Sequence, residues 1–129
     1  MTARTYRELV AWQRAMALAK GVYAFVRTMP ANEQFGLASQ MRRSAVSVPS
    51  NIAEGYGREN RPDFLRFLRT ARGSLFELRT QLELAESAGV ATPDVELLDL
   101  AAETDRVLQG LIRGLARSSP RGVNAVEGP

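Results

Sequence analysis

The 129-residue sequence contains no cysteine and no histidine. Without cysteine, neither a disulfide framework nor a thiolate metal site can form, and this usage suits a reducing compartment. The absence of both residue types also removes the commonest metal ligand, the commonest general base and the most nucleophilic side chain. We therefore expect a protein that is not an enzyme, has no catalytic residues and binds neither a metal nor a cofactor.

Long apolar runs are absent as well. No stretch approaches the roughly eighteen apolar residues of a membrane span, and the first residues lack the apolar core of a signal peptide. Hydrophobic residues make up 45% of the chain and charged residues 24%, which is an ordinary globular mixture. The sequence therefore predicts a soluble domain of the bacterial cytoplasm, with no membrane partner.

The charged residues that are present are unevenly distributed. The net charge is +3, but residues 1–79 have a balance of +7, residues 80–105 one of −7 and residues 106–129 one of +3. Sixteen of the 17 basic residues are arginine, whose planar group suits phosphates, carboxylates and aromatic faces. A protein that binds nucleic acid without sequence preference would not normally carry a separate acidic helix. We expect the opposite charges to favour head-to-tail contacts between subunits.

Apolar residues recur every three or four positions in four segments, as is typical of amphipathic helices. The predicted helices cover residues 6–28, 32–55, 61–88 and 92–117. Their apolar stripes are Leu9, Trp12, Met16, Ala19, Tyr23 and Val26; Leu37, Met41, Ala45, Val48 and Ile52; Phe64, Leu68, Ala71, Leu75, Leu78, Leu82 and Ala85; and Leu97, Ala101, Thr104, Leu108, Leu111 and Leu115. Helices of this length with short links favour an all-α, antiparallel up-down four-helix bundle at 1–117, with a disordered tail at 118–129.

Capping residues and prolines suggest where the helices begin and bend. Asn32, Asn60 and Thr92 are candidate N-caps of the second, third and fourth helices. Pro49 lies inside the second pattern, where proline removes a backbone hydrogen bond and clashes with the preceding turn. Because Ile52 keeps the phase of the stripe, we predict that the second helix is kinked at Pro49 and not broken.

Some apolar residues lie off these stripes, namely Val10, Phe25, Leu65, Phe76 and Leu100. Several such residues on different helices indicate a second buried surface, and we therefore expect a homo-oligomer. Glycines at helical spacing, Gly73 and the pair Gly110 and Gly114, predict places where another helix approaches closely.

A longer motif lies at residues 40–58. It reads Gln-Met-Arg-Arg-Ser-Ala-Val-Ser-Val-Pro-Ser-Asn-Ile-Ala-Glu-Gly, followed by Gly57-Arg58; Phe35-Gly36-Leu37 precedes it, and Arg66-Phe67-Leu68 and Gly73-Ser74-Leu75 follow. Across roughly residues 5–110 the sequence resembles the S23-like family, four-helix bundles that include proteins encoded in intervening sequences of bacterial 23S ribosomal RNA genes. The resemblance implies a four-helix bundle, a pentameric ring, and kinship with accessory proteins of diversity-generating retroelements, which bind RNA beside a reverse transcriptase.

Arginines supply the candidate nucleic-acid site, which consists of Arg42, Arg43, Arg58, Arg61, Arg69, Arg72, Arg79 and Phe76. As a functional surface, these arginines would follow phosphates and the aromatic ring would stack on a base. The partner would then be structured RNA or a reverse-transcriptase-like protein. As ordinary surface, the same arginines would pair with acids such as Glu77, Glu83 and Glu86. We favour the second interpretation, because runs of charge are usually solvated faces.

A polar cluster surrounds Pro49 and consists of Ser47, Ser50, Asn51, Glu54 and Glu77. It either forms a pocket for a ligand or satisfies the backbone groups that the proline leaves unpaired, and we favour the structural role. Trp12 and Tyr23 fall on a predicted core stripe, so we expect them to pack in the core.

Two functions therefore compete. The first is a ring-shaped homo-oligomer that binds structured RNA or an RNA-handling protein through its arginines. The second is a structural scaffold whose ligands are its own copies and a protein partner.

Overall fold

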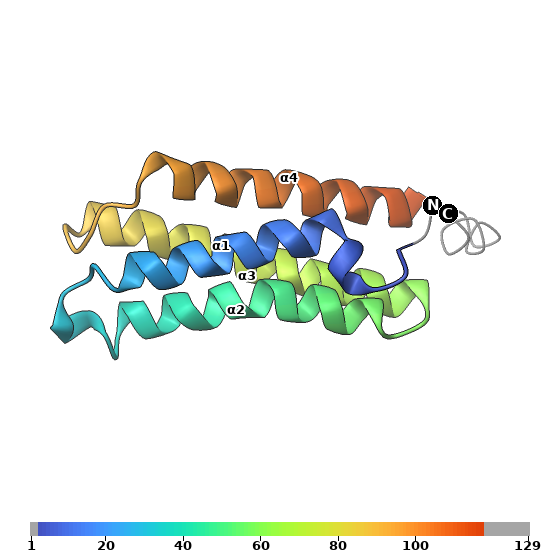
Figure 1. Cartoon of the computed structure of the whole chain (residues 1–129), viewed down its shortest axis with the longest axis horizontal. Coiled ribbons are helices and arrows are strands. Elements are labelled where there is room, and N and C mark those ends of the chain that lie inside the picture. The colour runs from blue at the N-terminus through green and yellow to red at the C-terminus, as the bar shows by residue number, and fades with distance from the viewer. Residues whose placement is uncertain (1–2, 118–129) are drawn as a thin grey trace.

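A computed structural model describes residues 3–117, which form α-helices and short 3₁₀ turns and contain no strand (Figure 1). The α-helices are α1 (Val10–Val26), α2 (Leu37–Tyr56), α3 (Arg61–Ser87) and α4 (Val95–Arg117), and the 3₁₀ turns are η1 (Tyr6–Glu8) and η2 (Ala31–Glu33). The predicted all-α, four-helix fold is confirmed. The tail predicted to be disordered, 118–129, lies outside the described residues.

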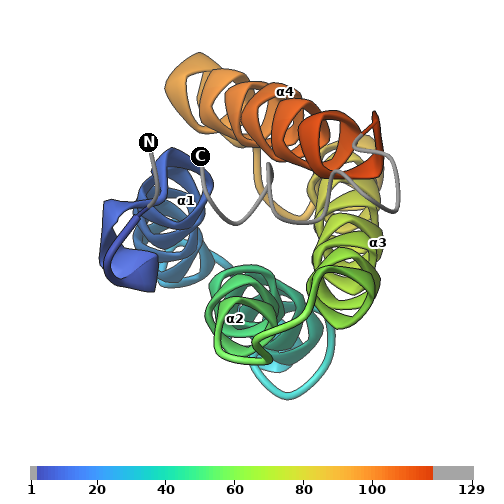
Figure 2. The same cartoon turned by 90° about the vertical axis from the view of Figure 1, so that its right-hand side faces the viewer.

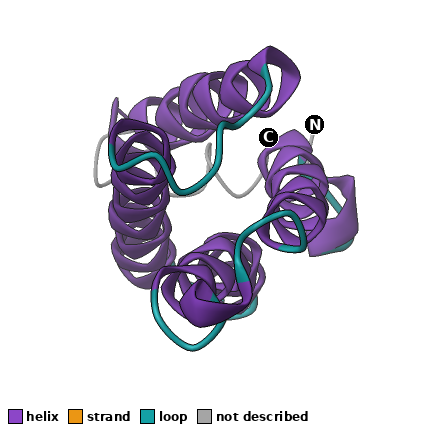
Figure 3. Ribbon diagram, turned by 90° about the vertical axis from the view of Figure 1, so that its left-hand side faces the viewer, coloured by secondary structure: helices purple, strands orange, loops and turns teal. Residues whose placement is uncertain are grey.

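The four helices surround one core in the order of the chain. Each helix packs mainly on its two neighbours in this order, and α4 closes the arrangement against α1 (Figures 2 and 3). Ser47 meets Ser74 and Ser44 meets Gln81, so residue numbers fall along α2 as they rise along α3, and these two helices run in opposite directions. Successive helices are joined at alternate ends of the long axis, and the described chain therefore starts and ends at the same end (Figure 1).

The core is a single cluster of apolar side chains from all four helices. The predicted stripes of α3 and α4 form much of this cluster. In α3 the stripe residues from Leu68 to Ala85 are fully buried, and in α4 only Leu111 of the stripe is partly exposed. Among the largest fully buried side chains are Leu18, Met41, Ile52, Leu68, Leu75, Leu78, Leu82 and Leu108. Burial of these side chains stabilises the fold by roughly 1.5–3 kcal/mol each before entropic costs.

The predicted core face of α1 is correct only in part, because Ala19 and Val26 are buried but the stripe as a whole is displaced from the core. The structure buries a neighbouring stripe, about 100° away on the helix, that comprises Ala11, Ala15, Leu18, Val22 and Phe25. Ala11 and Ala15 on this face let the first turns of α1 lie close to the other helices, and the larger Leu18, Val22 and Phe25 fill the core further along. Met16 and Tyr23, predicted to be in the core, are 38% and 41% exposed.

Helix α2 begins later than predicted and continues through its proline. Asn32 lies in η2, and α2 starts at Leu37 after Gly36, which makes no side-chain cap. The helix then passes through Pro49 to Tyr56 without interruption. Pro49 therefore does not break the helix, and a kink of its axis stays a prediction.

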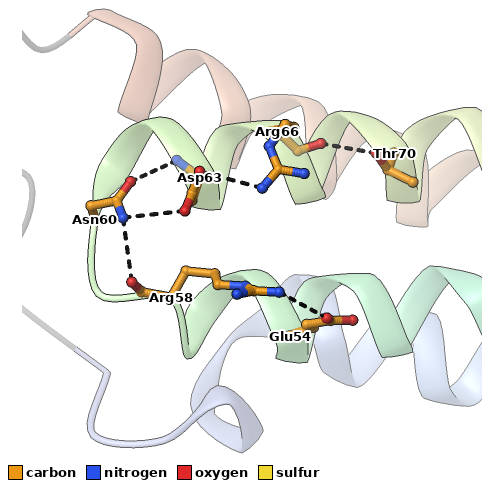
Figure 4. Close-up of polar contacts among 6 residues, drawn as sticks. All are labelled: Glu54, Arg58, Asn60, Asp63, Arg66 and Thr70. Atoms are coloured by element: carbon orange, nitrogen blue, oxygen red, sulfur yellow. Dashed lines mark hydrogen bonds and ion pairs between the residues drawn. The ribbon is translucent and has the colours of Figure 1, made fainter.

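Side-chain caps begin α3 and α4. The Oδ1 atom of Asn60 accepts a hydrogen bond from the backbone N–H of Asp63 at 2.9 Å, which confirms Asn60 as the N-cap of α3 (Figure 4). In α4 the capping residue is Asp94 and not Thr92, because Asp94 Oδ1 accepts a hydrogen bond from Leu97 N at 2.8 Å. Asp94 directly precedes the helix, whereas Thr92 is too far away to reach its first free N–H groups.

Of the glycines Gly55, Gly73, Gly110 and Gly114, only Gly55 allows a close approach between two helices. A Cβ atom on Gly55 would lie 2.6 Å from Cβ of Phe67, so α2 and α3 can pack at this distance only because the side chain is missing. In contrast, a Cβ on Gly73, Gly110 or Gly114 would have no neighbour within 4 Å in the described chain. The prediction that these three glycines admit another helix is therefore wrong within one copy of the chain.

This difference gives a matched pair of substitutions. Gly55→Ala should lower the free energy of unfolding by about 1–3 kcal/mol, because the new methyl group overpacks the contact between α2 and α3. Gly73→Ala should raise it by about 0.5–1 kcal/mol, because alanine is the better helix former and nothing obstructs it. Urea denaturation followed by circular dichroism measures both. Equal effects of the two substitutions would contradict the packing described for Gly55.

Candidate functional site

An apolar groove lies between α1 and α2 on the surface of the bundle. Its volume is about 630 Å³, and its lining residues are Tyr6, Trp12, Met16, Ala19, Lys20, Tyr23, Arg27, Val46, Pro49, Ser50 and Ala53. The side chains of Met16, Tyr23 and Val46 are between 38% and 43% exposed. The only charged residues in this lining are Lys20 and Arg27, which are both basic.

The N-terminal segment closes one end of this groove. The ring of Tyr6 in η1 meets the ring of Trp12 edge to face, with 5.2 Å between the ring centroids. The hydroxyl of Tyr56 donates a hydrogen bond to the carbonyl of Ala3, which fastens the segment to the end of α2. Trp12 is half-buried and packs against the edge of the core while it also lines the groove, so the predicted core packing is correct in part for Trp12 and wrong for Tyr23.

A second, polar groove lies between α2 and α3. Its volume is about 370 Å³, and it is lined by Gln40, Arg43, Ser44, Ser47, Ser74 and Glu77. The hydroxyls of Ser47 and Ser74 lie 2.7 Å apart, and the buried hydroxyl of Ser44 donates to Oε1 of Gln81 at 2.6 Å. These hydrogen bonds satisfy the polar atoms inside the pair of helices.

The residues predicted as one polar cluster around Pro49 do not form one pocket. Ser47 and Glu77 line the polar groove, Ser50 lines the apolar groove on the other side of α2, and Glu54 forms an ion pair with Arg58 at 3.2 Å. The four α2 residues are three or four positions apart and share its outer face, but Ser47 reaches the groove on one side of that face and Ser50 the groove on the other.

Asn51 does not repair the backbone at the proline. The carbonyl that loses its helical partner at Pro49 is that of Ala45, four residues earlier. The side-chain amide of Asn51 donates instead to the carbonyl and to the hydroxyl of Ser47, at 2.8 Å and 2.9 Å. Asn51 therefore does not satisfy the carbonyl that Pro49 leaves unpaired, contrary to the structural role that we favoured for the cluster.

Two arginines of the candidate nucleic-acid site are bound to a carboxylate of α4. Arg72 Nε lies 2.8 Å from Asp105 Oδ1, and Arg79 Nη1 lies 3.7 Å from Asp105 Oδ2. The guanidinium of Arg72 also lies 4.6 Å from the centroid of the Phe76 ring. Arginines of this face do pair with acids, as we favoured, but the partner is Asp105 and not Glu77, Glu83 or Glu86.

Helix α4 is held in the same way on its other side. Arg14 Nε of α1 lies 2.8 Å from Glu103 Oε2. Part of the acidic segment 80–105 thus pairs with the basic segment inside one copy of the chain. This pairing leaves the remaining carboxylates of α4, near its N-terminus, for the outer surface.

The other candidate arginines lie at separate places. Arg42 donates to the carbonyl of Gln34 at 3.0 Å and so braces the link before α2. Arg58 lies over the ring of Phe67 at 4.9 Å, and Arg61 opens α3 at the same end of the bundle. The remaining two are exposed and have no hydrogen bond or ion pair within residues 3–117; they are Arg43 and Arg69. The structure therefore does not bring the seven arginines together into one patch.

The N-terminus of α3 carries one perturbed carboxyl group. The pKa of Asp63 lies below its usual value because the Asn60 amide donates a hydrogen bond to it, and next because Arg66 does so (Figure 4). The group therefore remains ionised in mild acid, where its negative charge favours the positive end of the helix dipole. The arrangement belongs to the helix cap and has no feature of a reactive site.

Neither a metal site nor a membrane span emerges from the described chain. Within residues 3–117 no three histidine, cysteine, aspartate or glutamate side chains gather closely enough to bind a metal ion. Among the helices of the same residues, none has the length and apolarity that crossing a membrane requires.

Comparison with known proteins identifies relatives of this bundle. The family model described as 23S rRNA-intervening sequence protein matches residues 7–112. A crystal structure of a protein of unknown function from the S23 ribosomal protein family of Bacteroides thetaiotaomicron superposes with a TM-score of 0.74. The two chains share 21% identity, and the match covers 81% of this chain and 96% of the other. No curated protein matches the sequence.

The shared carboxylate gives the second prediction. Asp105→Asn should lower the free energy of unfolding by about 1–2 kcal/mol, because two charged hydrogen-bonding partners on α3 lose their counterion. The value lies toward the low end because both guanidinium groups remain partly in water. The matched control is Asp99→Asn, which removes an exposed carboxylate of the same helix and should change stability by less than about 0.5 kcal/mol. Thermal unfolding of both variants that shows equal shifts would contradict the role of Asp105.

Proposed function

The chain belongs to the family of 23S rRNA-intervening sequence proteins, and on that premise we propose that it is a non-enzymatic, homo-oligomeric scaffold of the cytoplasm. Its ligands are its own copies and a protein partner. The observation that carries this proposal is the apolar groove between α1 and α2.

The groove has the composition of a protein-binding surface. It contains Trp12 and Tyr23, which belong to the residue types that dominate binding energy at interfaces, and Met16, whose flexible side chain adapts to a partner. Apolar side chains that stay in contact with water gain about 25 cal/mol for each Å² that a partner covers. A second copy of the chain is always present at its own concentration and is therefore the first partner to consider.

Resemblance to known family members supports a pentameric ring as the form of this assembly. A reverse-transcriptase-like protein is the protein partner that the same resemblance favours. The chemistry of the chain supports the non-enzymatic part of the proposal, because it has neither histidine nor cysteine.

Binding of structured RNA is the second candidate function. Exposed Arg43 on α2 and Arg69 on α3 favour it, since neither guanidinium has a partner within residues 3–117. Arg72 and Arg79 contribute less to such a site because Asp105 neutralises part of their charge. The RNA site would therefore depend on Arg43, which lines the polar groove between α2 and α3, and on Arg69, which is exposed on α3.

The scaffold function predicts that the groove controls assembly. In sedimentation velocity at micromolar concentration, the unchanged protein should be an oligomer, and the double variant Met16→Glu with Tyr23→Glu should be a monomer, because charged groups replace the apolar side chains that a partner would cover. The control is Ala17→Glu, which changes an exposed residue of α1 that lies outside the groove. It should leave the oligomer unchanged. A monomeric unchanged protein would contradict the scaffold function.

The RNA function predicts a specific salt dependence. Fluorescence anisotropy with a labelled ribosomal RNA hairpin should give an affinity that falls as salt rises. The double variant Arg43→Gln with Arg69→Gln should reduce the slope of log affinity against log salt by about 1.5–2, as expected when two phosphate contacts are lost. The control, Lys20→Gln with Arg27→Gln, has the same change in charge and should retain the slope. Absence of binding at low salt would leave the scaffold as the sole function.

A further inference from the structure

We propose that the α1/α2 groove of one copy binds the first turns of α4 of a second copy, so that the copies associate head to tail. The inference rests on the proposed self-association and names the surface that fills the groove. It follows from charge complementarity between two exposed apolar surfaces of the same chain.

The groove requires an occupant that is both apolar and acidic. Lys20 and Arg27, its two charged lining residues, are seven positions apart, and seven residues are two turns of a helix, so they lie on the same side of α1. Neither forms an ion pair or a hydrogen bond with another residue of 3–117. An occupant with exposed carboxylates beside apolar side chains would neutralise this positive charge while its apolar side chains cover Met16, Tyr23 and Val46.

The first turns of α4 have this composition, and we call them the acidic ridge. Val95 and Leu98, three residues apart on one side of the helix, are 67% and 36% exposed. Glu96 and Asp99 flank them, are exposed, and have no ion pair within the described part of the chain. The next two carboxylates of α4 differ, because Glu103 and Asp105 are bound to arginines of α1 and α3.

The two surfaces of one copy cannot meet each other. Helix α4 packs on α1 and α3, whereas α2, which forms one wall of the groove, lies diagonally across the core (Figures 2 and 3). The contact is therefore between different surfaces of two copies, which produces a ring when the rotation closes and a filament when it does not. The end of α1, with Arg27 just beyond it, and the start of α4 lie at the same end of the long axis (Figure 1). Side-by-side bundles with a common direction can therefore bring the ridge to the groove.

Two other grooves among the described residues suit the ridge less well. The groove between α1 and α4 has a volume of about 460 Å³ and an apolar floor, but its charged lining residues are Asp94 and Glu96, which would repel an acidic occupant. The groove between α2 and α3 is lined mainly by polar side chains. Charge therefore selects the α1/α2 groove as the site for the ridge.

Reciprocal charge reversal tests the pairing. The groove variant is Lys20→Glu with Arg27→Glu, and the ridge variant is Glu96→Lys with Asp99→Lys. Each alone should associate on the order of 100-fold more weakly than the unchanged protein, because like charges then face each other. An equimolar mixture of the two should recover assembly, since the acidic groove of one now faces the basic ridge of the other. Sedimentation velocity measures assembly, and circular dichroism verifies that each variant is folded.

A control variant separates the pairing from a general effect of charge. Arg43→Glu with Arg69→Glu changes the net charge as much as the groove variant does but lies outside the α1/α2 groove and the acidic ridge, and it should assemble as the unchanged protein does. A mixture of Tyr23→Cys and Leu98→Cys proteins should form a disulfide-linked dimer on oxidation, which is informative because the chain has no other cysteine. A mixture of Val10→Cys and Leu98→Cys should not.

The outcomes distinguish this inference from the function on which it rests. A monomeric unchanged protein would overturn self-association itself. If the unchanged protein assembles and the reversed variants assemble equally well, self-association stands and the pairing is overturned. Loss of assembly in both variants without recovery in the mixture would also overturn it, as would a groove variant that loses only RNA binding. Recovery in the mixture, together with a disulfide between the Tyr23→Cys and Leu98→Cys proteins, supports the pairing.

Discussion

Helix α1 carries more apolar surface than a four-helix core can cover, and the character of the outer surface depends on this excess. The core accepts the face with Ala11, Ala15 and Leu18, because small side chains let the helices approach closely. The neighbouring face, with Trp12 and Met16, therefore lines the groove between α1 and α2. Covering that face with polar residues would have been the usual solution for a monomer, so its retention points to contact with another molecule.

The charges of the chain are divided between an internal and an external use. Asp105 and Glu103 point from α4 toward arginines of its two neighbours, and these pairs orient α4 on the bundle. Such pairs contribute modestly to stability, but they reduce the positive potential that an RNA would meet on α3. Outside this network, Lys20 and Arg27 line the groove between α1 and α2, whereas Glu96 and Asp99 are exposed on α4. The uneven distribution of charge along the sequence thus becomes an uneven distribution over the surface of the bundle.

The sequence predicted the elements that have a single interpretation. The stripe of α3 has one phase, so its core residues and the cap at Asn60 were predictable from local pattern alone. The phase of α1 was not predictable, because its apolar arc is broad and the choice among adjacent faces depends on the packing of all four helices. The partner of Arg72 was also out of reach, since Asp105 is 33 positions away and only the tertiary fold brings them together. Two glycines, Gly55 and Gly73, look alike in sequence, and their opposite roles follow only from what packs beside them.

The even number of helices places the start of η1 and the end of α4 at one end of the long axis (Figures 1 and 2). Entry and exit of the polypeptide are therefore close together, as they are in domains that tolerate insertion into a surface loop of a host protein. Within residues 3–117, the opposite end holds the connections from α1 to α2 and from α3 to α4, and the ring of Phe35 in the first of these is 97% exposed. A domain fused before η1 or after α4 would therefore leave the opposite end of the bundle exposed.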